Sequence, residues 1–261
     1  MKEDKKKIEI TPIYAGYLIK FAVRICIFTA VLVMYLTHKE ELGIFMNQPI
    51  SFGITPIHVL WALFMTLMIR HLFPANTLSM AILKQKEETF EEVSDYSELS
   101  LLRFVQNMNI RAWIVMLVWL SFNALFGFLY LIGLIGDGDL LMLTVFYFLC
   151  DYICILLFCP FQTFIMKNKC CVNCRIYDWG HIMMFTPMLF IRNFFSWSLF
   201  FTAFVVMFRW ELIYAKHSER FWEGSNRRLQ CAHCRDKTCQ IKKKINAALF
   251  PEEKQMQQTA K

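Results

Sequence analysis

The sequence has little charge for its length and few of the motifs that mark known chemistries. Only 19% of its 261 residues are charged and 57% are hydrophobic, whereas soluble domains are about a quarter charged and about half apolar. We find no glycine-rich phosphate loop, HExxH motif, nucleophile elbow, paired acidic motif or cofactor fingerprint. Internal repeats and low-complexity tracts are absent too. The composition predicts a membrane protein, and no motif decides whether it is an enzyme.

The charge that is present lies at particular places. The formal net charge is +7, and the basic residues collect at the two termini and beside the apolar runs. This distribution suits anionic lipid head groups and the control of membrane topology. A nucleic-acid partner is not expected, because no basic and aromatic recognition motif accompanies the charge.

Long apolar segments predict transmembrane helices of roughly 20 residues each. The first is expected to be retained, because no small-residue cleavage site follows it. Between the second and third lies a polar stretch in which Leu99, Leu102 and Val105 recur at helical spacing, which predicts a loop with an amphipathic helix. A tight turn at residues 136–139 is expected to join the last two. The four predicted helices cover residues 13–36, 54–72, 112–135 and 140–166.

The last apolar region, residues 181–209, is interrupted by Pro187 and by Arg192. One continuous helix would place Arg192 deep in hydrocarbon, at a cost of at least about 2.5 kcal/mol. We therefore expect two pieces, 182–191 and 194–214, which form a hairpin or a re-entrant segment. The competing picture is a short interfacial helix and a single crossing, which would put the C-terminal tail outside.

Excess Lys and Arg mark the cytoplasmic side of a membrane protein. By this rule both termini are cytoplasmic, as are the polar loop and the segment that follows residue 166. Residues 37–53 and the turn at 136–139 carry almost no basic charge, so they are expected outside. The cell (plasma) membrane is the expected location.

The predicted fold is all-α. It is a polytopic integral membrane protein with about four transmembrane helices, a C-terminal helical hairpin or re-entrant segment, and a small cysteine-rich cytoplasmic element. The chain then divides into a basic N-terminus, helices one and two, a cytoplasmic loop, helices three and four, a first cysteine segment, the hairpin, and a basic tail with a second cysteine segment. The corresponding ranges are 1–12, 13–73, 74–111, 112–166, 167–181, 182–214 and 215–261.

Six of the ten cysteines lie in the two cysteine segments. Their core pattern is CxxC…CxxC, and two such pairs can present four thiolates to one tetrahedral metal centre. Cytoplasmic thiols stay reduced, which favours metal binding over disulfides. Zinc and an iron-sulfur cluster suit four thiolates equally, and nearby cations such as Arg175 and Arg235 are expected to lower the thiol pKa. The predicted ligands are Cys171, Cys174, Cys231 and Cys234, with Cys170 and Cys239 as spare thiols.

Two ionisable residues are predicted inside the membrane. Arg24 in the first helix and Asp151 in the fourth are expected at similar depth, which predicts a structural ion pair. A proton or ion relay, or a protonated and hydrogen-bonded Asp151, are the alternatives. Cys150, Cys154 and Cys159 are expected to pack as small apolar residues.

The histidines and one asparagine complete the candidates. His38 and His58 are expected near the outer surface, and His71 and His181 near the inner one, so two bis-imidazole haem sites can be drawn. No extended pattern supports haem, and hydrogen-bonded histidines are expected instead. Asn123 is a candidate for a hydrogen bond between helices.

Three functions fit these features. The first is a structural or assembly subunit whose C-terminal segment is clipped to the fourth helix by zinc. The second is a redox protein in which an iron-sulfur or dithiol centre exchanges electrons with a membrane or redox partner. The third is a small transporter component that uses Arg24 and Asp151.

Overall fold

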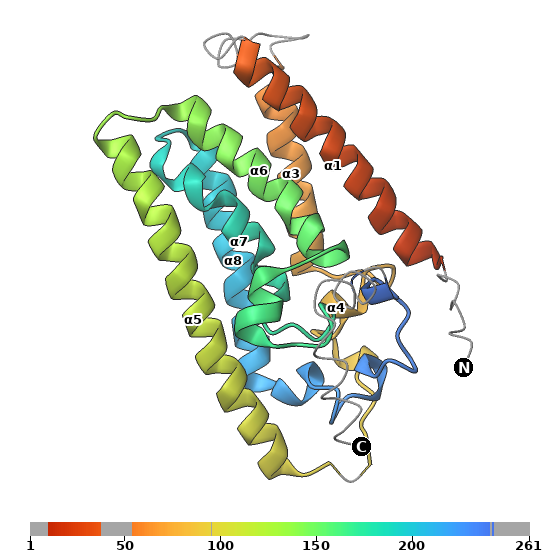
Figure 1. Ribbon diagram of the computed structural model, residues 1–261. Helices are drawn as coiled ribbons and strands as arrows, with labels where there is room; N and C mark the ends of the chain where they lie inside the picture. Colours follow the sequence, from red (N-terminus) through yellow and green to blue (C-terminus); the bar gives the residue numbers. More distant parts are fainter. Residues whose placement is uncertain (1–9, 38–53, 95, 241, 243–261) are drawn as a thin grey trace, which may run out of the picture.

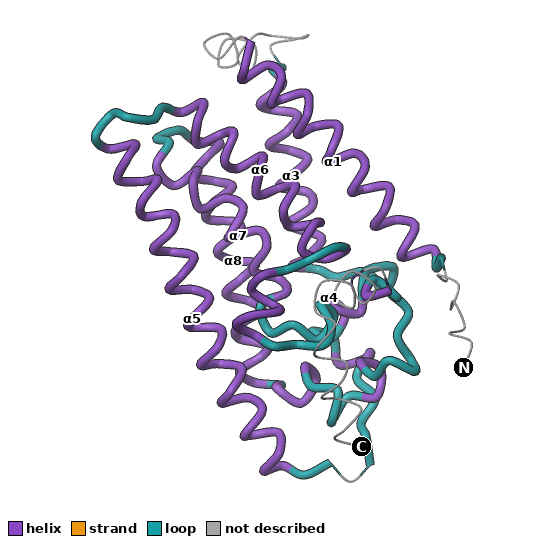
Figure 2. The backbone as a smooth tube through the Cα atoms, viewed as in Figure 1, coloured by secondary structure: helices purple, strands orange, loops and turns teal. Residues whose placement is uncertain are grey.

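The computed structural model describes residues 10–37, 54–94, 96–240 and 242, shown in Figures 1 and 2. Over these residues the chain is helical and contains no strand, so the predicted all-α class is confirmed. The four helices α1, α5, α6 and α8 are long and apolar enough to cross a membrane, whereas α3 has only 17 residues. Their bounds are α1 Pro12–Thr37, α3 Pro56–Leu72, α5 Glu98–Leu131, α6 Asp137–Leu156 and α8 Phe194–Lys216.

Two predicted helix boundaries are wrong. The amphipathic segment is not a separate helix, because it continues into the third apolar segment as the 34-residue helix α5. The first glycine of α5 is Gly127, and the helix contains no proline. Helix α6 ends at Leu156, not at residue 166, and Pro160 stands four residues later. Since proline lacks an N–H and clashes with the preceding turn, it stops the α-helix. The chain then continues as a single π-helical stretch, Phe161–Met166.

The segment before α8 forms the first leg of a hairpin, and α8 forms the second leg. It comprises the 3-10 helix η3 (Tyr177–Trp179), helix α7 (Gly180–Phe185) and the 3-10 helix η4 (Thr186–Phe190). The Asn193 side chain then caps α8 by accepting a hydrogen bond from Ser196 N at 2.7 Å. The two legs touch at both ends, where Trp179 Nε1 donates to Glu211 Oε1 and Ser196 Oγ to Met188 Sδ. The chain therefore enters and leaves the hairpin at the same end of the bundle.

The hairpin occupies the centre of the bundle, between α5 and α6 (Figure 1). At Gly127 a Cβ atom would lie 2.2 Å from the Phe190 ring, so glycine lets η4 approach α5. The outward faces of the long helices expose large apolar side chains such as Leu117, Leu125 and Phe201, which suits a lipid surround. The main core draws on α3, α5, α6, α7 and α8, and its buried members include Met68, Val115, Leu140, Phe185, Ala203 and Trp210.

Helix α1 lies at the edge of the bundle and packs chiefly on α6 (Figure 1). The contact is a small cluster of Tyr14, Tyr17, Tyr152 and Leu156. None of the most apolar 18-residue window of α1 is buried. Helix α1 is therefore attached along one narrow stripe.

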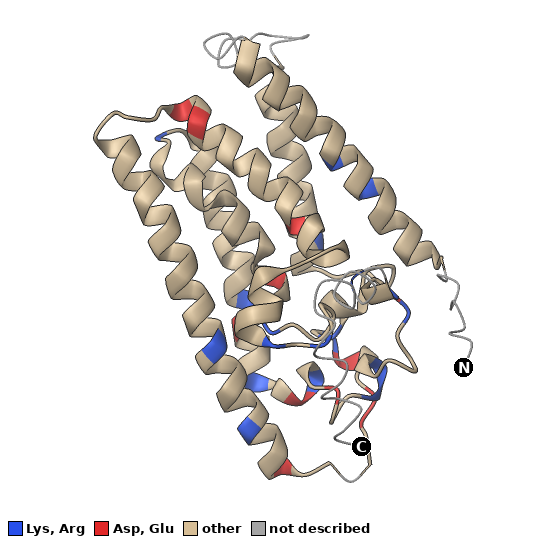
Figure 3. Cartoon of the chain, in the orientation of Figure 1, with Lys and Arg blue, Asp and Glu red and all other residues tan. Residues whose placement is uncertain are grey.

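The loops gather at one end of the bundle, as Figure 2 shows. We call the described residues within the ranges 77–93, 167–179 and 217–242 the cysteine element. Backbone hydrogen bonds join its parts, with Val93 N donating to Ser225 O at 3.0 Å and Arg227 N to Glu91 O at 2.7 Å. Most charged residues lie at this end (Figure 3). At the opposite end, Asp139 caps the start of α6 by accepting from Gly136 N at 2.8 Å.

Candidate functional site

The six cysteines predicted as ligands do not meet as two CxxC pairs. Cys170, Cys171 and Cys174 are buried, Cys234 and Cys239 are half-buried, and Cys231 is exposed. The two cysteine segments are nevertheless joined, because the thiols of Cys170 and Cys239 are hydrogen-bonded to each other. Within the described ranges, no group of three or more His, Cys, Asp or Glu side chains is arranged to hold a metal ion. The metal site therefore stays a prediction.

Polar side chains surround the Cys171 thiol at the end of α6. Its thiol donates to Gln162 Oε1 at 3.0 Å, and the ammonium of Lys242 lies 2.9 Å from its sulfur. Lys242 also donates to the Cys154 carbonyl, which is one of the last carbonyls of α6 and has no partner within the helix. A cation there also complements the helix dipole. Lys242 thus fastens the tail to the end of α6.

Two further cysteines, which the sequence predicted only as core residues, belong to this region. The Cys154 thiol donates a hydrogen bond to Cys159, and Cys159 also accepts from Gln162 N at 3.4 Å. Cys159 lies within electrostatic reach of both Cys171 and Cys174. The only sequence signal for this arrangement is Pro160, which ends α6 and frees Cys159 from helical geometry.

The expectation that nearby cations lower the thiol pKa values is wrong for two of the predicted ligands, Cys171 and Cys174. Burial raises the pKa of Cys171 to about 12, although Lys242 opposes it. Burial also raises the pKa of the Cys174 thiol. Arg175 does not counter this, because its guanidinium forms a two-pronged ion pair with Glu211 and stacks 3.7 Å over the ring of Tyr214. A cation that is already paired with a carboxylate lowers the pKa of a neighbouring thiol only slightly.

Cys159 behaves in the opposite way. The hydrogen bond from the Cys154 thiol lowers the pKa of Cys159 to about 7, against the effect of burial. Backbone N–H groups of Phe161 and Gln162 and the charge of Lys242 act in the same direction as that hydrogen bond. Cys159 is therefore the more acidic thiol of the pair, and the thiolate is the state that attacks disulfides and binds soft metals.

A second buried cation, Lys84, binds backbone carbonyls of the first cysteine segment. Lys84 is 1% exposed, and its ammonium donates to Val172 O at 2.8 Å and to Cys174 O at 3.2 Å. The rings of Trp210 and Phe221 lie 4.8 and 5.1 Å from the same nitrogen. Burial lowers the pKa of Lys84 to about 7. The ammonium of Lys84 holds these carbonyls in place, and within the described part of the chain it forms no ion pair.

The ion pair expected between the first and fourth predicted helices is present. Arg24 Nη1 lies 2.7 Å from Asp151 Oδ2 and also donates to the Phe148 carbonyl. The guanidinium lies 3.9 Å from the Tyr152 ring centroid. On its other side, Asp151 faces Gly180, where a Cβ would lie 2.9 Å from Oδ1. Arg24 has its partners in α6, so the pair has the geometry of an anchor for α1.

The histidines expected at the inner surface lie side by side. His71 Nδ1 is 2.7 Å from Asp178 Oδ1, and the rings of His71 and His181 are 4.6 Å apart at their centroids and nearly perpendicular. Gln85 donates to the other Asp178 oxygen at 3.4 Å. This is the hydrogen-bonded arrangement expected in place of haem. His58 instead hydrogen-bonds to Thr55 at the start of α3. His38 lies outside the described residues.

Asn123 also has the role expected of it. Its amide nitrogen donates to Trp119 O at 3.0 Å, and its oxygen accepts from the Tyr147 hydroxyl at 3.3 Å. Tyr147 belongs to α6, so the bond joins α5 to α6.

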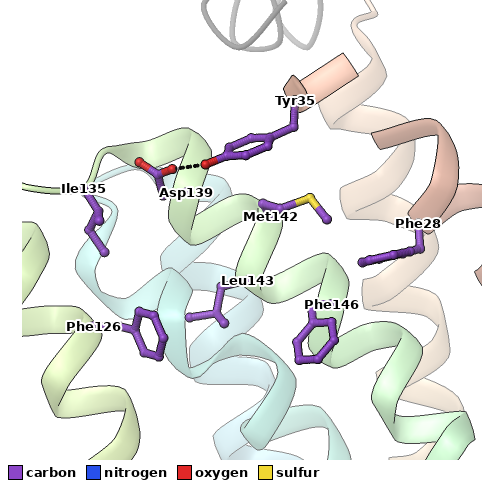
Figure 4. A pocket seen from close by; sticks show the side chains of 8 residues that line it. All are labelled: Phe28, Tyr35, Phe126, Ile135, Asp139, Met142, Leu143 and Phe146. Carbon is purple, nitrogen blue, oxygen red and sulfur yellow. Dashed lines mark hydrogen bonds between the residues drawn. The ribbon is translucent and has the colours of Figure 1, made fainter. Parts of the chain in front are cut away.

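Two cavities flank α1. The larger, of about 590 Å³, lies beside the ion pair and is bounded by α1, α3, α6, α7 and residues 77–82; we call it the α1 cavity. The smaller, of about 360 Å³, lies at the opposite end between α1, α5 and α6. Figure 4 shows that its lining is apolar except where the Tyr35 hydroxyl donates to Asp139. The smaller cavity therefore offers little chemistry.

Comparison with known proteins identifies no relative: no family model matches the chain, and no curated protein and no solved structure resembles it significantly.

Proposed function

We propose that the chain is an integral membrane protein whose cysteine element lies on the cytoplasmic face. The four apolar helices and their exposed apolar surfaces support this placement. So does the charge distribution, since among the described residues Lys and Arg are sparse at the end opposite the cysteine element (Figure 3). Basic residues concentrate on the cytoplasmic side of membrane proteins. Of the two predicted basic segments, 1–12 and 215–261, residues 1–9, 241 and 243–261 lie outside the described residues.

At this face we propose a thiol–disulfide redox centre. The observation that carries the proposal is the Cys154–Cys159 pair at the unwound end of α6. Cys159 is the attacking thiolate, and Cys154 is the thiol that resolves the mixed disulfide. Cytoplasmic thiols are kept reduced, so the resting protein is the dithiol and donates electrons to a partner disulfide.

The reaction balances in two exchanges. The Cys159 thiolate attacks the partner disulfide RSSR, forming a Cys159–SR bond and releasing RS⁻, which takes up a proton. Cys154 then loses its proton and attacks the Cys159 sulfur, forming the Cys154–Cys159 disulfide and releasing the second RSH. The protein loses two electrons and two protons, and the partner gains them. A thiol whose pKa lies near the ambient pH is the most effective attacker, and the lowered pKa of Cys159 moves that thiol toward this condition.

The test is thiol titration of the full chain in lipid nanodiscs. After equilibration in glutathione buffers of graded potential, peptide mass spectrometry is expected to find one disulfide, between Cys154 and Cys159. The variants Cys154→Ala and Cys159→Ala should each lose it, whereas Cys26→Ala, an exposed thiol of α1, should keep it. In Cys154→Ala the pH midpoint for alkylation of Cys159 should rise, because the hydrogen bond that lowers its pKa is gone.

Either of two results would contradict the proposal. One is the absence of a Cys154–Cys159 disulfide at every potential. The other is an alkylation midpoint of Cys159 near the ordinary thiol value of about 8.5 in the parent chain.

A second candidate is the metal centre predicted from the sequence, structural zinc or iron-sulfur. The hydrogen-bonded pair of Cys170 and Cys239 favours it, because this contact joins the two cysteine segments. Elemental analysis of anaerobically purified protein tests it. About one zinc per chain, or iron with broad visible absorbance, should be lost from Cys170→Ala and Cys239→Ala. Metal content that is unchanged in both variants would exclude these thiols as ligands.

A further inference from the structure

The α1 cavity remains unexplained by thiol chemistry. Its volume of about 590 Å³ is in the range of sites that hold small molecules. The lining is mostly apolar, and several lining residues are themselves exposed on the bundle surface, including Ile19 (66%) and Leu63 (49%). The cavity therefore opens sideways. For helices that cross a membrane, this opening faces lipid chains.

The cavity exists because α1 packs chiefly on α6. The tyrosine cluster and the Arg24–Asp151 pair hold α1 against α6 and leave space toward α3. Gly16 adds to this space, since a Cβ at that position would meet no atom within 4 Å. An apolar chain can occupy the space without displacing a side chain.

The charges around the cavity are not balanced. Lys20 lines it and lies within electrostatic range of Arg70 and of Arg24. Arg24 is neutralised by Asp151, and Asp178 is already bonded to His71. Lys20 and Arg70 repel each other as like charges, and among the described residues neither forms an ion pair. A bound anion would relieve that repulsion.

We infer that the α1 cavity binds an anionic phospholipid, with an acyl chain in the apolar space beside Gly16 and the phosphate between Lys20 and Arg70. These two cations lie toward the end of the bundle that carries the cysteine element, where a head group of the same leaflet would sit. The inner leaflet of the cell membrane is the one rich in anionic lipid. The inference rests on the membrane placement proposed above and is independent of the thiol chemistry.

The experiment uses the full chain in nanodiscs that contain equal amounts of phosphatidylglycerol and phosphatidylcholine, followed by detergent extraction and native mass spectrometry. The parent chain should retain phosphatidylglycerol in preference to phosphatidylcholine. The double variant Lys20→Gln/Arg70→Gln should retain about tenfold less of it, since each cation near the surface contributes to anionic lipid binding. A matched variant, Arg103→Gln/Lys216→Gln, removes two exposed cations outside the cavity and should retain as much as the parent.

A second variant tests the apolar half of the site. Gly16→Leu adds a side chain at a position that lines the cavity and where a Cβ meets no atom within 4 Å, so it should also reduce retention. Ala22→Leu, at a position of α1 that does not line the cavity, should not. Equal retention by Lys20→Gln/Arg70→Gln and by its matched control would overturn the inference, as would displacement of the lipid by millimolar inorganic phosphate. Cys154–Cys159 disulfide formation should be unchanged in all four variants, so the two proposals fail separately.

Discussion

Helix α1 and the cysteine element are both attached to the same central bundle, but by different means. Helix α1 has one ion pair, Arg24–Asp151, and a small tyrosine cluster. The cysteine element has several cations that are nearly or fully buried, among them Arg175, Lys84 and Lys242. Removing a partner from a buried charge costs far more than removing one from an exposed charge. We therefore expect the cysteine element to be the more firmly attached of the two, and α1 to be displaced without unfolding of the rest.

The largest effect is expected where a charge of the cysteine element is most buried. The Arg175 side chain is 6% exposed and is paired with Glu211 of α8. Glu211→Ala leaves that guanidinium unpaired and also removes the acceptor of Trp179 Nε1, so the free energy of unfolding should fall by about 3–4 kcal/mol. Denaturant titration in micelles measures it. In the control, Arg175→Met/Glu211→Leu, most of the loss should be absent. If Glu211→Ala is as stable as the parent, the proposed difference in attachment between the cysteine element and α1 is refuted.

A smaller and more local effect is expected at α1. Arg24 and Asp151 are 12% and 30% exposed, so Asp151→Leu should cost about 2 kcal/mol, less than a fully buried pair. Hydrogen exchange should quicken in α1 and stay unchanged in the cysteine element. Arg24→Leu/Asp151→Leu, which removes both charges, should restore slow exchange. If Asp151→Leu instead destabilises the whole bundle, α1 is an integral part of the core, and the proposed difference between the two regions disappears.

The features that could be predicted from the sequence are those that depend on residues close together along the chain. Apolar length located α1, α3 and α8, and the interruptions at Pro187 and Arg192 predicted two legs before residue 214. Depth along a helix, at about 1.5 Å per residue, was enough to pair Arg24 with Asp151. These inferences use only spacing and the cost of charge in hydrocarbon.

What could not be predicted depends on contacts between distant segments. The basicity around the cysteines suggested lowered thiol pKa values, but Glu211 pairs Arg175 and burial dominates at Cys171. Nothing near Cys159 in sequence reveals Lys242, which lies in the tail. Pro160 was the available clue that Cys159 leaves the helix, and its weight becomes clear only from the unwound end of α6.

The smallest effect concerns pH and compares two ways of satisfying a buried cation. Lys84 is held by carbonyls and aromatic rings and lacks the carboxylate that Arg24 has. Burial lowers its pKa to about 7 from an ordinary 10.5. Between these values the unfolded chain binds more protons than the folded one, so stability rises with pH.

This rise can be isolated with Lys84→Met, which keeps the apolar stem and removes the titrating group. From about pH 7 to about pH 8.5 the parent should gain about 1 kcal/mol per pH unit more than the variant, the limit for one proton being 1.36. Thermal unfolding in micelles at fixed ionic strength measures both slopes.

Cys159, whose pKa is also lowered, contributes in the same direction to both proteins and cancels in the difference. The raised pKa of Cys171 acts only at higher pH. Parallel slopes would mean that Lys84 stays charged throughout, and that carbonyls and aromatic rings hold a buried cation as firmly as the carboxylate of Asp151 does.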